Sequence, residues 1–229
     1  MKTTFIFLHG GPGFRDYLRP YFSSLENKFR CVFFDQVRGD TITIDDQLAQ
    51  LDQILCVEAG RIVLVGHSWG GVLAIAYASR WPGKLAGLVL ISTGLNYSQW
   101  TAEFRAELKA LNLEDASPEE IFLTPAEQDL GRPLLDSTWA SFSSETFESL
   151  SSSFLQSYDL VTPFSKLKMP ILNIFGSKDV RFPTRVTGTF RTYNDQVVDF
   201  EIPSAGHFPF VLQANRDKIV EMIERTFAI

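Results

Sequence analysis

The chain reads Val65-Gly66-His67-Ser68-Trp69-Gly70-Gly71 at the point where an apolar stretch passes into a helical pattern. A serine between a strand and a helix needs a turn tight enough to lift its hydroxyl above the sheet. Side chains at the flanking positions would collide in such a turn, which explains Gly66 and Gly70. The helix that follows directs its positive dipole end toward developing negative charge. The stretch predicts that Ser68 is a nucleophile.

Short apolar stretches alternate with helical patterns along the rest of the chain. The predicted strands lie at 5–8, 31–34, 62–65, 88–91, 171–175 and 196–202. Helical spacing predicts helices at 14–28, 44–55, 70–81 and 219–227. Strands that are apolar on both faces and alternate with helices indicate an α/β fold with a mostly parallel, doubly wound sheet. Functional groups in such a sheet follow the carboxyl ends of the strands.

A glycine-rich loop, His9-Gly10-Gly11-Pro12-Gly13, follows the first predicted strand. An acyl-transfer enzyme needs two backbone N–H groups directed at the oxyanion. We expect one from Trp69, the residue after the candidate nucleophile, and the other from Gly11. The alternative is a loop that cradles phosphate, but no lysine follows the glycines as a P-loop requires.

The candidate base and acid also follow predicted strands. Of the three histidines, His9 lies in the glycine-rich loop and His67 adjoins Ser68, which leaves His207 as the base. Asp179 follows the strand at 171–175 and is the expected acid, since a buried carboxylate there would orient the imidazole. The chain order Ser, Asp, His is the order that this type of fold imposes.

An insertion at 94–168 separates two parts of the predicted sheet. We expect residues 1–93 and 169–229 to form the core, and the insertion to form a helical cap, or lid, over the active edge. Ser117 and Thr124 each begin a helix-start pattern with a glutamate three residues later. The candidate pocket walls are aromatic: Trp69, Trp100, Phe104, Trp139, Phe142 and Phe208.

The insertion carries twelve acidic and five basic residues, a net charge of −7, against −6 for the whole chain. We expect most of these charges to lie on a solvated face. Any that line the pocket would attract amines and repel anions. The net charge also makes a basic surface for nucleic acid unexpected.

Composition limits the remaining classes of protein. With 229 residues, the chain fits one domain plus an insertion. Its two cysteines, Cys31 and Cys56, are both predicted to be small buried hydrophobes, which suits a reducing compartment and suggests a cytoplasmic protein. We expect no membrane span, no signal peptide, no metal site and no cofactor, because the sequence holds no matching motif.

The sequence resembles the α/β-hydrolase superfamily, and within it most resembles the prolyl aminopeptidase and small carboxylesterase branch. The matching segments are HGGPG at 9–13, FDQ at 34–36, GHSWGG at 66–71, GSKD at 176–179 and GHFP at 206–209. The chain departs from the family pattern because it begins without two strands that usually come first. The loop at 37–40 and the insertion are also shorter than usual, which puts peptidase specificity in doubt.

Three functions follow from these observations. The first is hydrolysis of a small carboxylic ester, or amide, through an acyl-serine intermediate, with a small-molecule acyl substrate. The second is a prolyl aminopeptidase, which needs a carboxylate pair near a bound amine. The third is a non-catalytic, ligand-binding protein of the same fold. The absent strands would leave 31–34 as an exposed sheet edge, which suggests cover by a local segment or a second copy in a homodimer.

Overall fold

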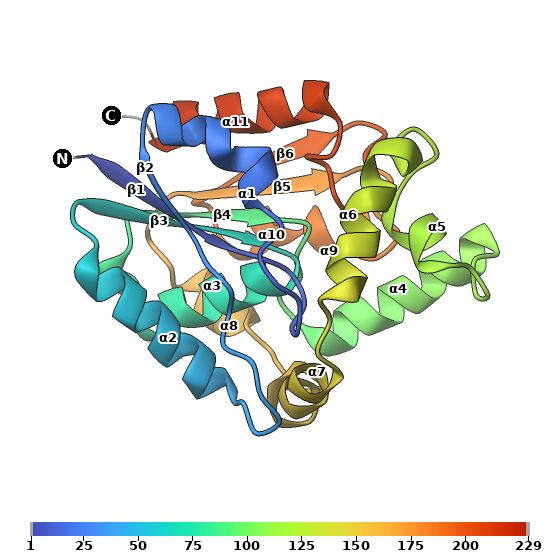
Figure 1. The fold of residues 1–229 in the computed structure, drawn as a ribbon, viewed down its shortest axis with the longest axis horizontal. Helices are drawn as coiled ribbons and strands as arrows, with labels where there is room; N and C mark the ends of the chain where they lie inside the picture. Colours follow the sequence, from blue (N-terminus) through green and yellow to red (C-terminus); the bar gives the residue numbers. More distant parts are fainter. Residues whose placement is uncertain (1, 228–229) are drawn as a thin grey trace.

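A computed structural model describes residues 2–227 and shows one six-stranded sheet, in which every pair of neighbouring strands is parallel (Figure 1). The strand order is β2-β1-β3-β4-β5-β6. The strands are β1 (Thr3–Leu8), β2 (Arg30–Phe33), β3 (Arg61–His67), β4 (Gly87–Ile91), β5 (Ile171–Gly176) and β6 (Val197–Ile202). All six predicted strands are confirmed, and their order places the carboxyl ends of β3, β5 and β6 on one edge.

Helices cover both faces of the sheet, as the sequence predicts. The helices on one face are α1 (Arg19–Phe22) and α11 (Gln213–Phe227). Those on the other are α2 (Ile44–Val57), α3 (Trp69–Arg80), α8 (Val161–Ser165) and α10 (Phe190–Tyr193). The side chains of β1 are buried on both faces of the sheet. Phe5 and Phe7 pack toward α11, while Ile6 and Leu8 pack toward α2 and α3. Each large apolar side chain buried in this way contributes about 1.5–3 kcal/mol.

The insertion lies at the carboxyl ends of the strands, between β4 and β5 (Figure 1). Its first helices are α4 (Tyr97–Leu111), α5 (Pro118–Phe122), α6 (Gln128–Ala140) and α7 (Ser144–Leu150), and a π-helical turn at Ser151–Leu155 follows. The capping box at Ser117 is present. The Thr124 N–H and hydroxyl also donate to Glu127, but the Glu127 N–H bonds Thr124 O instead of the hydroxyl, so Thr124 begins a turn and α6 starts only at Gln128.

The predicted helix at 14–28 is wrong in its first part. Residues 14–18 are irregular, and only α1 and the 3₁₀ turn Ser23–Asn27 that follows are helical. Tertiary contacts explain the difference, because Arg15 and the backbone N–H of Asp16 both donate to the carboxylate of Asp35, at 2.5 and 2.8 Å. These contacts hold residues 14–18 near the end of β2 in a conformation that is not helical.

The two cysteines differ in burial. Cys31 is buried in β2 as predicted, whereas Cys56 is exposed, which contradicts the prediction. Leu55 directs its side chain into the core, and the next residue of α2 therefore faces solvent. Strand β2 is the edge strand, as expected, and its cover by a second copy stays a prediction.

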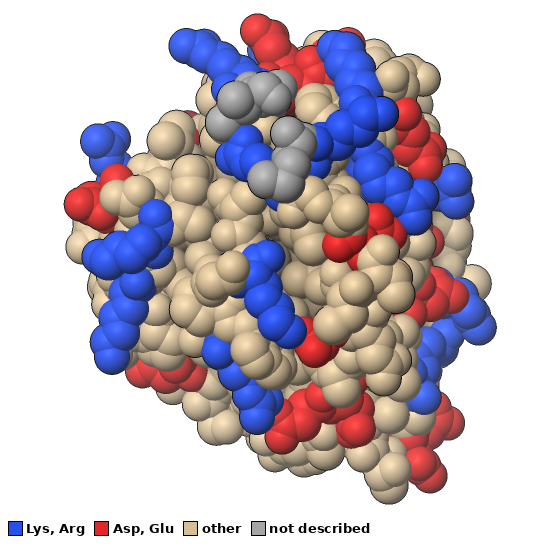
Figure 2. All heavy atoms as spheres, turned by 90° about the vertical axis from the view of Figure 1, so that its left-hand side faces the viewer, with Lys and Arg blue, Asp and Glu red and all other residues tan. Residues whose placement is uncertain are grey.

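Figure 2 shows the face around the two chain ends, on the side away from the insertion. Lysine and arginine side chains are interspersed there with aspartate and glutamate. This face therefore has no single-sign field of the kind that attracts nucleic acid. None of the helices within residues 2–227 is long and apolar enough to cross a bilayer.

Candidate active site

Ser68 stands at the turn between β3 and α3 with backbone angles φ 54° and ψ −120°. A non-glycine residue held in this region stores about 1–3 kcal/mol of strain. The turn is kept in place by the Ser68 N–H bond to Ile91 O at 2.9 Å and by the Thr93 hydroxyl, which donates to Ser68 O at 2.7 Å. A Cβ at Gly66 would lie 2.3 Å from Gly70 O, and one at Gly70 would lie 2.0 Å from Leu8 O. The two glycines are therefore sterically required, as predicted.

The predicted base and acid are brought together at the ends of β5 and β6. The Nδ1–H group of His207 donates to Oδ2 of Asp179 at 3.0 Å, and both side chains are buried. The other carboxylate oxygen of Asp179 accepts the backbone N–H of Phe182 at 2.9 Å. With Nδ1 as the donor, Nε2 of the neutral ring is left as an acceptor.

The glycine-rich loop leaves β1 beside the serine turn, because Leu8 pairs with Gly66 across the two strands. His9 holds the loop: its Nδ1–H donates to Gly10 O at 2.7 Å, while its Nε2 accepts the Gln36 N–H at 3.1 Å. The Gln36 side chain joins His9 O to the Trp69 indole at 2.8 Å on each side. The two residues expected to form the oxyanion hole, Gly11 and Trp69, both line the cavity described below.

Burial lowers the pKa of His9 to about 4, against 6.5 for an unperturbed histidine. Between these two values the unfolded chain binds a proton that the folded chain does not, so folding loses stability as the pH falls. We expect this contribution to the free energy of unfolding, about 3 kcal/mol, to be fully present at a pH above the pKa of the unperturbed histidine. It should be lost as the pH falls to the pKa of His9 in the folded chain. Burial also lowers the pKa of His67, so the titration of this histidine also destabilises the folded chain as the pH falls.

The measurement is urea unfolding of wild type and His9→Gln near neutral pH and near pH 5. The glutamine oxygen replaces Nε2 as acceptor of the Gln36 N–H but does not titrate, so the fall in unfolding free energy on acidification should be smaller in the variant. Comparison with wild type removes the contribution of the carboxylates, which titrate in both. An equal fall in both proteins would show that His9 does not titrate as its burial implies.

A buried chain of hydrogen bonds connects the glycine-rich loop with the histidine loop. The Gly10 N–H donates to the Tyr17 hydroxyl at 2.8 Å, and that hydroxyl donates to Nδ1 of His67 at 2.6 Å. The Nε2–H of His67 in turn donates to His207 O at 2.9 Å. His67 therefore acts behind the site as a connector, and Tyr17 is a site residue that the sequence analysis missed.

The insertion also holds the histidine loop. Glu127 is fully buried, and its carboxylate accepts the Gly206 N–H at 3.0 Å and the Thr124 N–H at 2.9 Å. The His207 N–H donates to Phe122 O at 3.0 Å. Burial raises the pKa of Glu127, and these hydrogen bonds oppose the rise. Glu127, which the sequence predicts to be part of a helix cap, thus fixes the backbone beside the candidate base His207.

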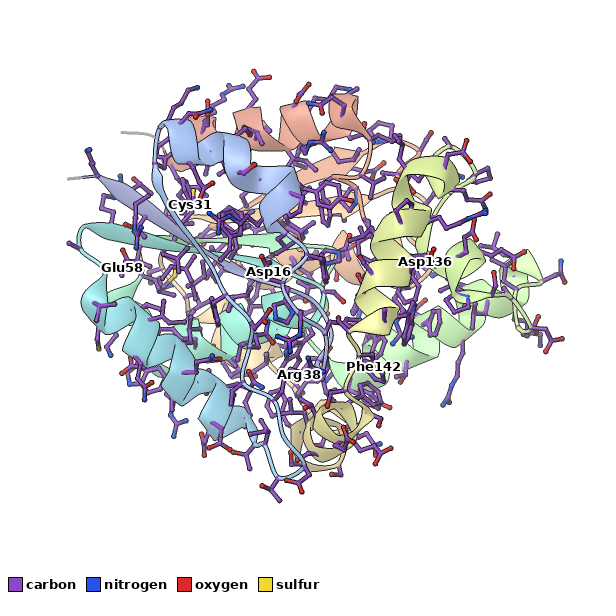
Figure 3. The ribbon with its side chains drawn as sticks, in the orientation of Figure 1. Asp16, Cys31, Arg38, Glu58, Asp136 and Phe142 are labelled. Atoms are coloured by element: carbon purple, nitrogen blue, oxygen red, sulfur yellow. The ribbon has the colours of Figure 1, made fainter. Side chains whose placement is uncertain are left out.

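A cavity of about 820 Å³ lies between the sheet edge and the insertion. Ser68 and His207 both line it. All the predicted aromatic wall residues line it as well: Trp69, Trp100, Phe104, Trp139, Phe142 and Phe208. The loop after β2 is tied to the insertion near this cavity, since Arg38 donates to Ser141 O at 2.8 Å next to Phe142 (Figure 3). The cavity is thus an aromatic chamber with the candidate nucleophile and base on its wall.

Few charged side chains line this cavity. Among the acidic residues of the insertion that the structure describes, Glu148 lines the cavity. Two basic residues, Arg105 and Arg181, line it as well. The acidic charge of the insertion therefore lies mainly elsewhere, as expected, and the cavity itself does not repel anions. Within residues 2–227, no group of three His, Cys, Asp or Glu side chains is arranged to hold a metal ion.

Residues 5–221 match the profile of the alpha/beta hydrolase family, which covers nearly the whole chain. The chain belongs to this family. The all-parallel doubly wound sheet with helices on both faces is therefore the α/β-hydrolase fold that the resemblance implies.

Curated proteins that resemble the chain include proline iminopeptidases and a decarboxylase. A proline iminopeptidase of Saccharolobus solfataricus is 39% identical over 42% of this chain and 34% of its own length. A cis-3-alkyl-4-alkyloxetan-2-one decarboxylase of Shewanella oneidensis is 32% identical over 39% of this chain and 32% of its own. A proline iminopeptidase of Lactobacillus helveticus is 25% identical over 92% and 85%. The chain thus spans about a third of the length of the first two relatives.

Several solved structures share the fold at low sequence identity. A proline iminopeptidase-related protein of Thermus thermophilus has a TM-score of 0.79 at 20% identity, with 98% of this chain and 90% of that chain covered. A thermophilic esterase of Thermogutta terrifontis has a TM-score of 0.76 at 21% identity, with 99% and 90% covered. These similarities show that the insertion and the sheet have counterparts, and they concern the fold alone.

Proposed function

We propose that this alpha/beta hydrolase is a serine hydrolase that cleaves a small carboxylic ester. The observation that carries the proposal is the buried hydrogen bond of 3.0 Å between His207 and Asp179, at the wall of a cavity that Ser68 also lines. This arrangement supplies a nucleophile, a base in a defined tautomer and an apolar space for an acyl group. The esterases among the structural neighbours agree with it.

The proposed reaction follows from these roles. His207 Nε2 takes the proton of the Ser68 hydroxyl while the oxygen attacks the ester carbonyl. The backbone N–H groups of Gly11 and Trp69 stabilise the oxyanion, and Asp179 stabilises the imidazolium that forms. Collapse expels the alcohol, which receives the proton from His207. A water molecule, deprotonated by His207, then releases the acid from the acyl-serine.

A proline aminopeptidase is the second candidate, because the curated relatives include several proline iminopeptidases. An enzyme of that kind needs a carboxylate pair to bind the free amine of its substrate. On the cavity wall formed by residues 2–227 there is one carboxylate, Glu148. The same wall also carries two arginines. This charge balance favours the ester hydrolase over the aminopeptidase. A non-catalytic ligand-binding protein is the third candidate, and the paired His207 and Asp179 weigh against it.

A panel of p-nitrophenyl esters of increasing acyl length, assayed beside proline p-nitroanilide, tests the proposed function. We expect turnover of the esters and little release from the anilide, because the cavity is apolar and lacks a carboxylate pair. Rapid anilide turnover with inert esters would establish the aminopeptidase. Inertness toward both, with no labelling by a fluorophosphonate probe, would establish the non-catalytic protein.

The two unpaired cysteines support a proposed cytoplasmic location. An exposed thiol such as that of Cys56 persists where the surroundings are reducing.

A further inference from the structure

Arg181 lines the cavity two residues after Asp179, and its surroundings are aromatic. Its guanidinium carbon lies 4.4 Å from the centre of the Trp100 ring and 4.6 Å from that of Phe104, both on α4. The Trp100 indole N–H donates to the Arg181 carbonyl at 2.7 Å, which fixes the backbone in place. Cation–π contacts of this kind hold the guanidinium at a defined point of the wall.

Arg181 forms no ion pair in the part of the chain that the structure describes, although the charge of Asp179 acts on it without direct contact. Its nearest carboxylate neighbour in sequence, Asp179, has one oxygen bonded to His207 and the other to the Phe182 N–H. The glutamates of α4, Glu103 and Glu107, pair with Arg185 at 2.7 and 2.8 Å instead. Arg181 is half-buried, and its five N–H donors have no anionic acceptor within residues 2–227, so an anion that enters the cavity can bind them.

Two phenols stand beside this charge. Tyr97 and Tyr158 line the cavity, and the Tyr97 ring centre lies 5.5 Å from that of Trp100 and 6.4 Å from that of Tyr158. Neither hydroxyl has a hydrogen-bond partner within residues 2–227. Burial lowers the pKa of Arg181 to about 10, so the group stays charged at neutral pH. The three side chains supply hydrogen-bond donors to the wall of the same cavity, and both tyrosines are close enough to Arg181 to act on its charge.

We propose that the substrate is an ester that also carries a carboxylate, and that Arg181, with Tyr97 and Tyr158, binds this carboxylate. The proposal rests on the ester-hydrolase function above and names its substrate class. A planar carboxylate matches the fork of the guanidinium, and the phenols can donate to the same oxygens. Phe182 stacks on His207 at 5.6 Å and on Trp100 at 5.1 Å, so two rings separate the imidazole from the guanidinium. An acyl chain several bonds long spans that interval, as in the half-ester of a dicarboxylic acid.

The test compares three p-nitrophenyl esters of equal acyl length: the half-ester of adipate, the neutral hexanoate and the ω-amino hexanoate. Arg181→Met keeps the length and apolar contacts of the side chain but removes its charge. We expect kcat/KM for the adipate half-ester, relative to the hexanoate, to fall by about 10- to 100-fold in this variant. Hexanoate hydrolysis should change by less than about threefold. Arg185→Met, which removes a charge on the outer side of α4, is the matched control and should alter neither ester.

The outcomes separate this proposal from the proposed function. An equal loss on all three esters in Arg181→Met would make the arginine a structural clamp and overturn the proposal. Preference of the wild type for the amino ester would overturn it as well. If every ester is inert, the ester-hydrolase function is wrong, and calorimetric titration with adipate then tests the proposed carboxylate site by itself. Binding of adipate that is lost in Arg181→Met would support the site. Absence of binding to the wild type would overturn it. Tighter binding of pentyl phosphate than of adipate would overturn the choice of carboxylate.

Discussion

Ser68→Ala is expected to lower turnover of a p-nitrophenyl ester by about 10⁴- to 10⁶-fold. In the proposed mechanism the hydroxyl oxygen forms the acyl-enzyme bond, and no other group on the described cavity wall lies at a strand–helix turn beside the glycine-rich loop. The residual rate comes from the oxyanion donors and from binding alone. The measurement is kcat under saturating ester, with labelling by a fluorophosphonate probe as a second readout.

Ser92→Ala is the matched control for this substitution. Ser92 directly follows β4 and has a positive φ of 48°, as Ser68 directly follows β3 with a positive φ, but Ser92 does not line the cavity. Its replacement should leave kcat within about threefold of wild type and should not affect labelling. Retention of label in Ser68→Ala would place the nucleophile elsewhere and remove the basis of the proposed mechanism.

Asp179→Asn is expected to lower kcat by about 10⁴-fold. The amide oxygen can still accept the Phe182 N–H, so the loop should keep its shape. The amide nitrogen would then face Nδ1 of His207 as a donor and stabilise the tautomer that carries its proton on Nε2. That tautomer cannot accept the serine proton, and the positive charge that forms on the ring loses its neighbouring anion.

Asp199→Asn serves as the control, because Asp199 is another aspartate near the last strand and accepts a hydrogen bond from Asn173 at 2.7 Å. We expect its kcat to stay close to that of wild type. The opposite pattern, with Asp179→Asn active and Asp199→Asn inactive, would show that a different carboxylate orients the histidine. Ester hydrolysis at saturation and circular dichroism spectra of both variants complete the comparison.

The local signals in the chain predicted most of the sheet and the positions of the candidate catalytic residues. Strands β1, β3, β4 and β5 are short segments that are almost entirely buried, whereas the edge strands β2 and β6 are partly exposed. The serine turn needs Gly66 for a local steric reason, because a Cβ there would meet Gly70 O, whereas Gly70 is needed because a Cβ would meet Leu8 O on the neighbouring strand. Because parallel strands end at one edge, Ser68, Asp179 and His207 could be assigned to that edge from their places after β3, β5 and β6.

Other site residues gave no local signal. Glu127 has the sequence pattern of a helix cap, yet its carboxylate holds Gly206, which lies 79 residues further along the chain. Tyr17 falls in a segment predicted to be helical, and its hydroxyl bonds His67, 50 residues away. Cys56 follows a buried leucine in an amphipathic helix, and a small error in assigning the helix face was enough to reverse its predicted burial.

The sequence by itself determined the layered fold, the serine turn and the residues available as base and acid, because those features depend on interactions between near neighbours and on strand ends. Only the tertiary structure decided the charge of the cavity. The sequence predicts that most of the twelve acidic residues of the insertion face solvent, but it does not show which charges reach the cavity wall; folding places Glu148, Arg105 and Arg181 there. Net charge is a sum over residues, whereas the field inside a cavity depends on which side chains reach its wall.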